Sequence, residues 1–308
     1  MLLPSNTWLR RAPLDHLDLD WLTQANIEVA ILRLDQIDPL ISGNKWFKLS
    51  EHLKAADRAG AKGIISLGGA HSNHLHALAA AGKRFGFPTV GLLRGHPQDT
   101  PTVKDLQAFG MQLHWLGYGG YRARHEPGFW QPWQAQYPEL QPVPEGGGGL
   151  PGAKGCMPLK AMVSAQLSGL GWNDSTAGGW PAAPAPPWPA WCWPKRASIG
   201  FTARWRYPTS MAVAQQVQGI VQEAGSVDAG YELLDASRGG FAKVDPPLLE
   251  FIEQTERDSG IPLEPLYTGK ALLALKQQVD AGKFTQGTRL IFIHTGGLQG
   301  RRGFSPAT

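Results

Sequence analysis

The sequence lacks long hydrophobic runs and has little cysteine. No apolar stretch approaches the roughly 18 residues of a membrane-spanning helix, and the first residues lead to Arg10 and Arg11 without the apolar core of a signal peptide. The two cysteines, Cys156 and Cys192, form no disulfide framework and no Cys-x-x-Cys zinc motif. We therefore expect a soluble, cytoplasmic protein with no membrane partner and no metal site.

One stretch also lacks acidic residues. The formal charge of the chain is +4, from 29 lysines and arginines against 25 aspartates and glutamates. Residues 175–210 carry four basic residues and no acidic residue, so the remainder of the chain has equal numbers of each sign. The positive excess belongs to that segment, and it therefore gives no argument for a nucleic-acid partner.

What remains has an α/β pattern. The 308 residues are 42% hydrophobic and 18% charged, which suits a globular protein of one large or two ordinary domains. Helical spacing of apolar residues covers 46–56, 74–82, 102–109, 248–256 and 270–279, and strand-like runs cover 63–67, 89–93, 111–116 and 290–293. This alternation predicts parallel sheets, in which ligands collect at the carboxyl ends of the strands.

Two short motifs indicate chemistry. Residues 43–45 read Gly-Asn-Lys just before a helical run, and residues 68–74 read Gly-Gly-Ala-His-Ser-Asn-His at the end of a strand. A lysine held by a tight turn and an anion cradle at a helix start are what an enzyme needs to bind a carbonyl cofactor and an amino-acid carboxylate. The alternatives are a surface lysine in a turn and a plain helix cap.

Residues 175–210 do not resemble the rest of the chain. Seven of the 25 prolines and five of the 12 tryptophans fall there, and so many prolines exclude helix and most strand. One interpretation is a polyproline linker or a proline-rich interaction module, although a linker rarely carries so much tryptophan.

The genetic code offers a sharper interpretation of this segment. When the codons are read one base over from Gly179, they permit an apolar strand, a Gly-Thr-Gly-Thr phosphate loop and an Ala/Leu helix, and 201–209 permits a second strand. We therefore hypothesise that about 174–211 is translated out of frame. The chain as written then lacks its phosphate loop, so local disorder and reduced stability are expected, and a cofactor-deficient, inactive product is one alternative.

Five motifs together resemble a known family. They are 43–45, 69–74, 144–147 (Pro-Glu-Gly-Gly), 267–270 (Tyr-Thr-Gly-Lys) and 294–297 (His-Thr-Gly-Gly). In order and spacing they are similar to the family of 1-aminocyclopropane-1-carboxylate deaminase and D-cysteine desulfhydrase. These are fold-type II pyridoxal-phosphate enzymes related to the tryptophan synthase β subunit. The resemblance runs from about Leu34 to Gly297, apart from the aberrant segment.

The resemblance implies a two-domain α/β fold in which each domain is an open, mainly parallel sheet flanked by helices. Residues 1–47 and 148–308 would form the larger cofactor domain, and 48–147 the smaller, substrate-side domain. Residues 146–149, four consecutive glycines, would act as a hinge. A homodimer is also implied.

The resemblance assigns roles to the first motifs. Lys45 would form the Schiff base with the cofactor and then move the substrate's α-proton. Lys48 would lie near the cofactor phosphate, the alternative being a solvated helix face. Ser72 and His74 would bind the region of the substrate carboxylate, and Asn73 the 3′-oxygen of the cofactor.

The later motifs bear on the substrate. Tyr267 would stack or exchange protons near the bound substrate, and Thr268 and Thr295 would meet the pyridine nitrogen. Deaminases of the family typically have Glu and Leu at these two positions, whereas desulfhydrases have small hydroxyl residues. We therefore expect β-elimination from D-cysteine or a related small amino acid, with the deaminase as the alternative. The family often has Gln where this chain has His71, so the substrate pocket is expected to differ.

Overall fold

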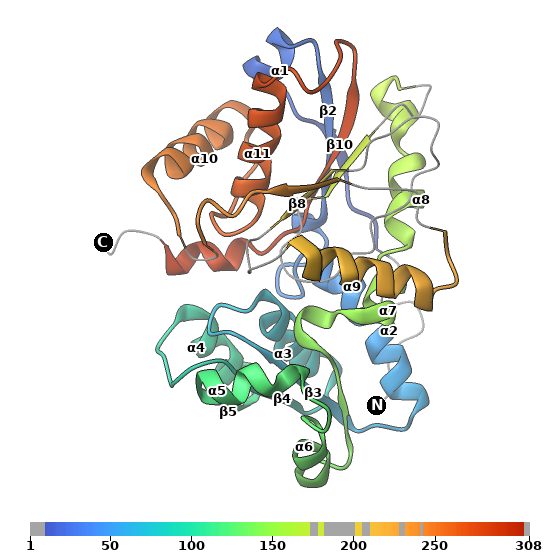
Figure 1. Ribbon diagram of the computed structural model, residues 1–308, viewed down its shortest axis with the longest axis vertical. Helices are drawn as coiled ribbons and strands as arrows, with labels where there is room; N and C mark the ends of the chain where they lie inside the picture. Colours follow the sequence, from blue (N-terminus) through green and yellow to red (C-terminus); the bar gives the residue numbers. More distant parts are fainter. Residues whose placement is uncertain are drawn as a thin grey trace. The chain divides into compact units, whose positions relative to one another are not determined.

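The computed structural model describes residues 10–172, 178–181, 201–204, 210–227, 232–240 and 243–304. They divide into two compact units (Figure 1). Unit 1 comprises Arg10, residues 38–156 and residues 302–304, and unit 2 comprises residues 11–37 and the described part of 157–301.

The division differs from the expected one, which separated 48–147 from the rest. Helix α2 (Asn44–Arg58) is continuous and packs against α7 (Gly149–Gly155), so both ends of the predicted boundary belong to unit 1. The four glycines at 146–149 consequently lie inside unit 1 rather than between the two units.

Unit 1 is built on a four-stranded sheet in which all neighbouring strands are parallel. The strand order is β5 (Gln112–Trp115), β4 (Thr89–Leu93), β3 (Gly63–Gly68), β6 (Leu140–Pro142). Strand β3 is buried along its whole length, as expected for an inner strand covered on both faces.

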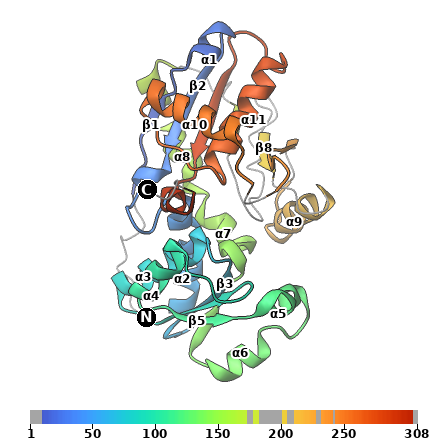
Figure 2. The same cartoon turned by 90° about the vertical axis from the view of Figure 1, so that its left-hand side faces the viewer.

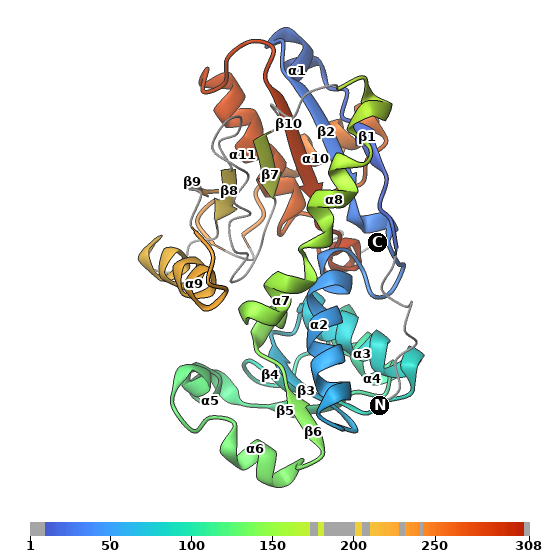
Figure 3. The ribbon, with the colours of Figure 1, turned by 90° about the vertical axis from the view of Figure 1, so that its right-hand side faces the viewer.

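Helices cover both faces of this sheet. Helix α5 (Gly117–Arg122) and α6 (Gln131–Gln136) lie on the opposite side from α3 (Asn73–Phe85) and α4 (Pro101–Ala108) (Figures 2 and 3). The α5–α6 side is packed with aromatic side chains, including Tyr121, Trp130 and Trp133, against Ile65 and Leu67. Two 3-10 turns, η2 (Ala123–His125) and η3 (Glu145–Gly147), complete the unit.

Unit 2 contains a second four-stranded sheet. Its order is β1 (Leu14–His16), β2 (Glu28–Arg33), β10 (Arg289–His294), β7 (Gly178–Pro181). Both neighbours of β10 run parallel to it, and only the edge strand β1 is antiparallel. Strands β8 (Phe201–Arg204) and β9 (Glu232–Asp235) form a separate parallel pair.

Helices also lie on both sides of the unit 2 sheet. Helices α10 (Pro246–Ser259) and α11 (Thr268–Asp280) lie on one side and α8 (Pro158–Ser164) on the other (Figures 1 and 3). Leu248, Leu272 and Leu275 pack with Ile31 and Phe292 in one buried cluster. The remaining elements are α1 (Asp20–Gln24), α9 (Ser210–Glu223), η1 (Leu34–Gln36), η4 (Leu167–Leu170) and η5 (Leu298–Gly303).

The α/β prediction is confirmed, and every helix and strand expected from the pattern is present within about two or three residues of its expected ends. Residues 175–210 contain two strands, β7 and β8, although the prolines of this segment predicted no helix and little strand. The two strands coincide with the two places where the shifted reading predicts strands. The expected phosphate loop, helix and local disorder fall outside the described residues. No helix of the described part could span a membrane.

Candidate functional site

Lys45 lies in the first turn of α2. Gly43 adopts φ 64° and ψ −140°, a conformation that favours glycine, and Trp46 N–H donates to the Gly43 carbonyl as the helix begins. The Lys45 side chain is buried, and its Nζ donates to the carbonyl oxygen of Gly146 at 3.1 Å. The turn predicted from Gly-Asn-Lys therefore directs this lysine into the unit, and the surface alternative is wrong.

Lys48 follows one helical turn later and is 1% exposed, so the alternative of a solvated helix face is also wrong. Burial is the main cause of lowered pKa values at both amines. The pKa of Lys48 falls to about 8, and that of Lys45 lies well below its usual range, helped by the charge of Lys48. A lower pKa raises the fraction of a lysine that is unprotonated and able to attack a carbonyl carbon.

His74 is buried beside these lysines. Its Nε2 lies 2.8 Å from Ser66 Oγ, and that hydroxyl lies 2.7 Å from the Val143 carbonyl. Burial, followed by the charges of Lys45, His52 and Lys48, places the pKa of His74 well below its usual range. The ring is therefore neutral, which leaves one of its two nitrogens as a hydrogen-bond acceptor.

The glycines at 146–149 form the wall that these side chains share. Gly146, Gly147 and Gly149 have φ values near +70°. A Cβ atom on Gly147 would lie 3.3 Å from His74 Cε1, and one on Gly152 would lie 1.9 Å from the Gly147 carbonyl oxygen. Glycine at these positions lets the backbone approach the buried side chains closely.

Ser72 and Asn73 lie where the sequence predicted, at the start of α3. Ser72 is the N-cap, and its Oγ accepts from the Leu75 N–H at 3.2 Å. Gly68 permits this fold, because a Cβ there would lie 2.4 Å from Ser72 Oγ. The capping alternative is thus present, and the same helix start still presents backbone N–H groups and the Ser72 hydroxyl hydrogen to an anion.

In unit 2, Tyr267 and Thr268 lie at the start of α11, where Tyr267 is half-buried and Thr268 is fully buried. The Glu264 carboxylate accepts from the Thr268 backbone N–H at 2.6 Å and lies 3.2 Å from Thr268 Oγ1. Burial raises the pKa of Glu264 to about 7. The Thr268 hydroxyl is therefore held by Glu264.

Thr295 follows β10 and is also buried. The preceding residue, His294, uses both ring nitrogens: Nε2 donates to the Pro262 carbonyl at 2.7 Å, and Nδ1 accepts from the Gly296 N–H at 3.2 Å. The His-Thr-Gly-Gly loop is thus fixed in shape by its histidine.

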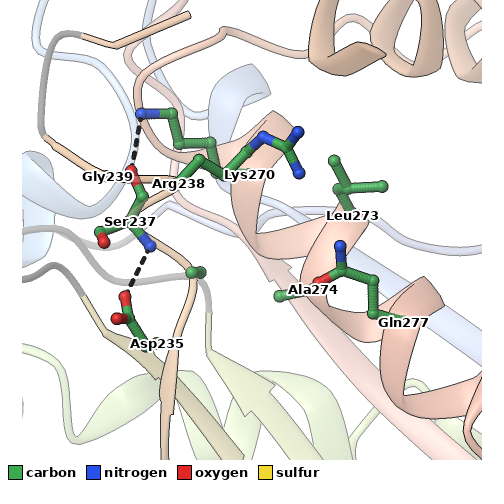
Figure 4. Close-up of a pocket in the computed structure, with 9 residues that line it drawn as sticks. Asp235, Ser237, Arg238, Gly239, Lys270, Leu273, Ala274 and Gln277 are labelled. Carbon is green, nitrogen blue, oxygen red and sulfur yellow. Dashed lines mark hydrogen bonds between the residues drawn. The ribbon is translucent and has the colours of Figure 1, made fainter. Parts of the chain in front are cut away.

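A cavity of about 290 Å³ lies in unit 2 between the loop after β9 and one face of α11 (Figure 4). The two cations in its wall already bind the protein itself. Arg238 pairs with Asp245 at 2.7 Å, and Lys270 Nζ donates to the carbonyls of Gly240 at 3.0 Å and Ser237 at 3.4 Å. None of the residues that line this cavity was predicted as a site residue.

The structure groups Lys45, Lys48 and His74 around one glycine loop, with Ser72 and Asn73 at the start of the helix that carries His74. Tyr267, Thr268 and Thr295 belong to the other unit. Sequence reasoning missed Ser66 and Glu264, which orient His74 and Thr268. For Ser66 a signal existed, since it is the one polar residue of a strand that reads Gly-Ile-Ile-Ser-Leu-Gly.

A comparison with known proteins identifies a homologue. A protein of Pyrococcus furiosus named "Putative 1-aminocyclopropane-1-carboxylate deaminase" is 27% identical over 278 residues, which cover 84% of this chain and 82% of that protein. The two proteins are homologues. The resemblance predicted from the motifs is therefore confirmed, although no protein-family model matches the chain.

Solved structures agree on the fold. The crystal structure of an ACC deaminase homologue superposes with a TM-score of 0.76 at 21% identity, covering 96% of this chain and 91% of that one. A hydrogen sulfide-producing enzyme from Fusobacterium nucleatum gives a TM-score of 0.63 at 11% identity, covering 96% and 97%. At such identities the likeness shows the fold, which is that of the fold-type II pyridoxal-phosphate enzymes.

The residues of unit 1 fit pyridoxal phosphate. A carbonyl group needs an unprotonated amine, and burial lowers the pKa of Lys45 toward that form. A phosphate needs a cation, and Lys48 is one turn away, with a pKa of about 8 that a bound anion would raise. The aromatic 3′-oxygen and the substrate carboxylate need donors, which the start of α3 offers.

Proposed function

We propose that this protein is a pyridoxal-phosphate-dependent lyase that eliminates the β-substituent of a small amino acid, with D-cysteine as the preferred substrate. The observation that carries the proposal is Lys45, an amine buried at a helix start, with a depressed pKa and a neutral histidine beside it. The homologue from Pyrococcus furiosus supports the lyase class.

The residues of the chain have distinct tasks in this proposal. Pyridoxal phosphate, when bound, withdraws electrons from the substrate's α-carbon. Lys45 would hold the carbonyl carbon of the cofactor and would act as the base for the substrate's α-proton. Lys48 binds the phosphate, Asn73 the 3′-oxygen, and Ser72 with the N–H groups of α3 the substrate carboxylate. The family resemblance gives Tyr267 a stacking or acid/base role.

Water is the one reactant that the overall reaction needs besides D-cysteine. Removal of the α-proton and departure of the β-thiol as hydrogen sulfide leave an enamine. Hydrolysis of this enamine by one water molecule gives pyruvate and ammonia.

The preference for D-cysteine rests on Thr268 and Thr295. A hydroxyl partner protonates the pyridine nitrogen less than a carboxylate does and so moderates electron withdrawal. The alternative substrate is 1-aminocyclopropane-1-carboxylate, which is favoured by the name of the Pyrococcus furiosus homologue. We also propose a cytoplasmic homodimer; a monomeric mass by light scattering would contradict its oligomeric part.

We further propose that the codons for about 174–211 are read out of frame, so that this chain lacks the loop that would complete the phosphate site. The supporting observation is that β7 and β8 occur at the two positions where the shifted reading predicts strands. β7 reads Gly-Gly-Trp-Pro, a sequence of low strand propensity. The strand is therefore favoured by its pairing with β10 and not by its own residues.

The test is the visible absorbance of the purified protein with added pyridoxal phosphate, beside a Lys45→Ala control and a frame-corrected chain. A lysine-dependent band followed by hydrogen sulfide release from D-cysteine supports the proposal. Turnover of 1-aminocyclopropane-1-carboxylate instead would select the deaminase. A band in the frame-corrected chain alone would mean that this polypeptide is the cofactor-deficient product, and no band in either would refute the lyase assignment.

A further inference from the structure

One ring nitrogen of His74 has a buried lone pair that nothing in the described residues uses. His74 is 2% exposed, and its Nδ1 has no hydrogen-bond partner there. An unpaired polar atom inside a protein costs free energy, so a donor for this nitrogen is expected.

The hydrogen bonds at the other nitrogen fix which tautomer is present. The Val143 carbonyl can only accept, so the Ser66 hydroxyl donates its hydrogen to that carbonyl. Ser66 Oγ must then accept from His74, which places the imidazole hydrogen on Nε2. Nδ1 is therefore an acceptor and requires a donor.

This excludes one role that the sequence suggested for the side chain. A carboxylate has no hydrogen to donate, so the neutral His74 ring cannot bind the substrate carboxylate. The backbone N–H groups at the start of α3 remain available for that task. The His74 ring instead suits an ammonium, a hydroxyl or a thiol.

Several titratable groups surround this nitrogen and Lys45. They are Lys48 and His52 from α2, Glu145 from η3 and Cys156 after α7. His52 is already bound to the Gly148 carbonyl at 3.0 Å, and Glu145 to Tyr121 and Arg124. Cys156 is a weak donor.

Lys45 is the donor that the geometry favours. Its Nζ binds the carbonyl of Gly146, and the ring of His74 contacts the next residue, with Nδ1 lying 3.4 Å from where a Cβ of Gly147 would be. Both groups therefore border the same short piece of backbone. The charge of Lys45 lowers the pKa of His74 more than that of Lys48 does, which favours Lys45 of the two amines.

We propose that His74 is a positioning residue that accepts a hydrogen bond from Lys45 Nζ–H and thereby holds the ammonium that Lys45 becomes after taking the substrate's α-proton. Ser66 is the second member of this relay, since it keeps the acceptor on Nδ1. The catalytic part of this inference rests on the proposed function, whereas the contact itself does not.

The contact can be tested in the cofactor-free protein. The pH dependence of reductive methylation of Lys45, followed by peptide mass spectrometry, reports the pKa of this amine. We expect His74→Phe to lower that pKa by about one unit, because the ammonium loses a charge-assisted hydrogen bond. His74→Gln should restore most of the shift, since an amide oxygen also accepts.

A matched control lies two residues along the same helix. His76 is buried and binds Asp105 at 3.1 Å, so His76→Phe should lower thermal stability without moving the Lys45 profile. A Lys45 pKa that is unchanged in folded His74→Phe would overturn the proposal, and so would equal values for the Phe and Gln variants. If His74→Phe does not fold, Ser66→Ala should give a smaller shift in the same direction, and no shift there would likewise count against the relay.

The two proposals can fail separately. If the protein turns over D-cysteine, His74→Phe should lower kcat at least about tenfold with little change in KM, and the acid limb of the kcat profile should move to lower pH. A methylation shift without any turnover would keep the Lys45–His74 contact and refute only the lyase function.

Discussion

His74 in unit 1 and His294 in unit 2 are both buried, and burial lowers the pKa of each. They differ in how their nitrogens are used. Both nitrogens of His294 are bound to backbone groups, whereas His74 binds Ser66 through one nitrogen and has no described partner at the other. A neutral histidine with both nitrogens hydrogen-bonded to the backbone fixes the shape of a loop. A neutral histidine with one unbonded acceptor nitrogen can still bind a donor.

The surrounding charges show the same contrast. In unit 2 the buried Glu264 carboxylate accepts from the backbone N–H groups of Thr268 and Leu266. In unit 1 Lys45 and Lys48 are buried together, and burial lowers the pKa of each amine. The buried Glu264 carboxylate is thus held by backbone hydrogen bonds, whereas the group around Lys45 includes His74 Nδ1, which has no partner in the described residues.

The largest expected effect comes from replacing Lys45, the buried amine of unit 1. Under the proposed function, Lys45→Met should reduce turnover about a thousandfold or more, because the proposed nucleophile and base is lost. The variant should stay folded, since a buried amine is replaced by an apolar side chain of similar length. Turnover and urea unfolding measure both effects. Lys54, an exposed residue of α2 bound to Glu51, gives the control: Lys54→Met should leave turnover unchanged.

The second prediction concerns pH and stability. Lys48 has a pKa of about 8 in the folded chain against 10.5 for an unburied lysine. Between these pH values the unfolded chain binds more protons, so the free energy of unfolding should rise with pH. The full rise is about 3 kcal/mol for this group at 1.36 kcal/mol per unit. Urea titrations should show a flatter profile for Lys48→Met, and an unchanged slope would contradict the burial of this amine.

The helix boundaries and the position of Lys45 could be predicted from sequence because local signals determine them. Gly43 sets the start of α2, and Ser72 caps α3. The burial of Lys48 could not be predicted, since all residues from Asn44 to Ser50 are buried and the helix has no solvated side there for the pattern to reveal. The partnership of Ser66 with His74 depends on tertiary contact between a strand and a helix start, which spacing alone does not specify.

The third prediction concerns His294, whose two ring nitrogens are both hydrogen-bonded to the backbone. His294→Phe should lower the free energy of unfolding by about 2 kcal/mol, because the Pro262 carbonyl and the Gly296 N–H both lose a buried partner. Urea unfolding monitored by circular dichroism gives the value. A loss below about 0.5 kcal/mol would mean that the His-Thr-Gly-Gly loop does not depend on its histidine.

The smallest expected effect is the stability cost of the open histidine. His74→Phe removes one hydrogen bond, to Ser66, and also removes an acceptor that has no partner in the described residues. The cost should be about 1 kcal/mol, roughly half that of His294→Phe, by the same urea unfolding. Equal costs would mean that the Lys45 contact stabilises the cofactor-free chain as much as a hydrogen bond to the backbone does. A smaller cost for His74 would show that this contact contributes less to stability than the two backbone hydrogen bonds of His294.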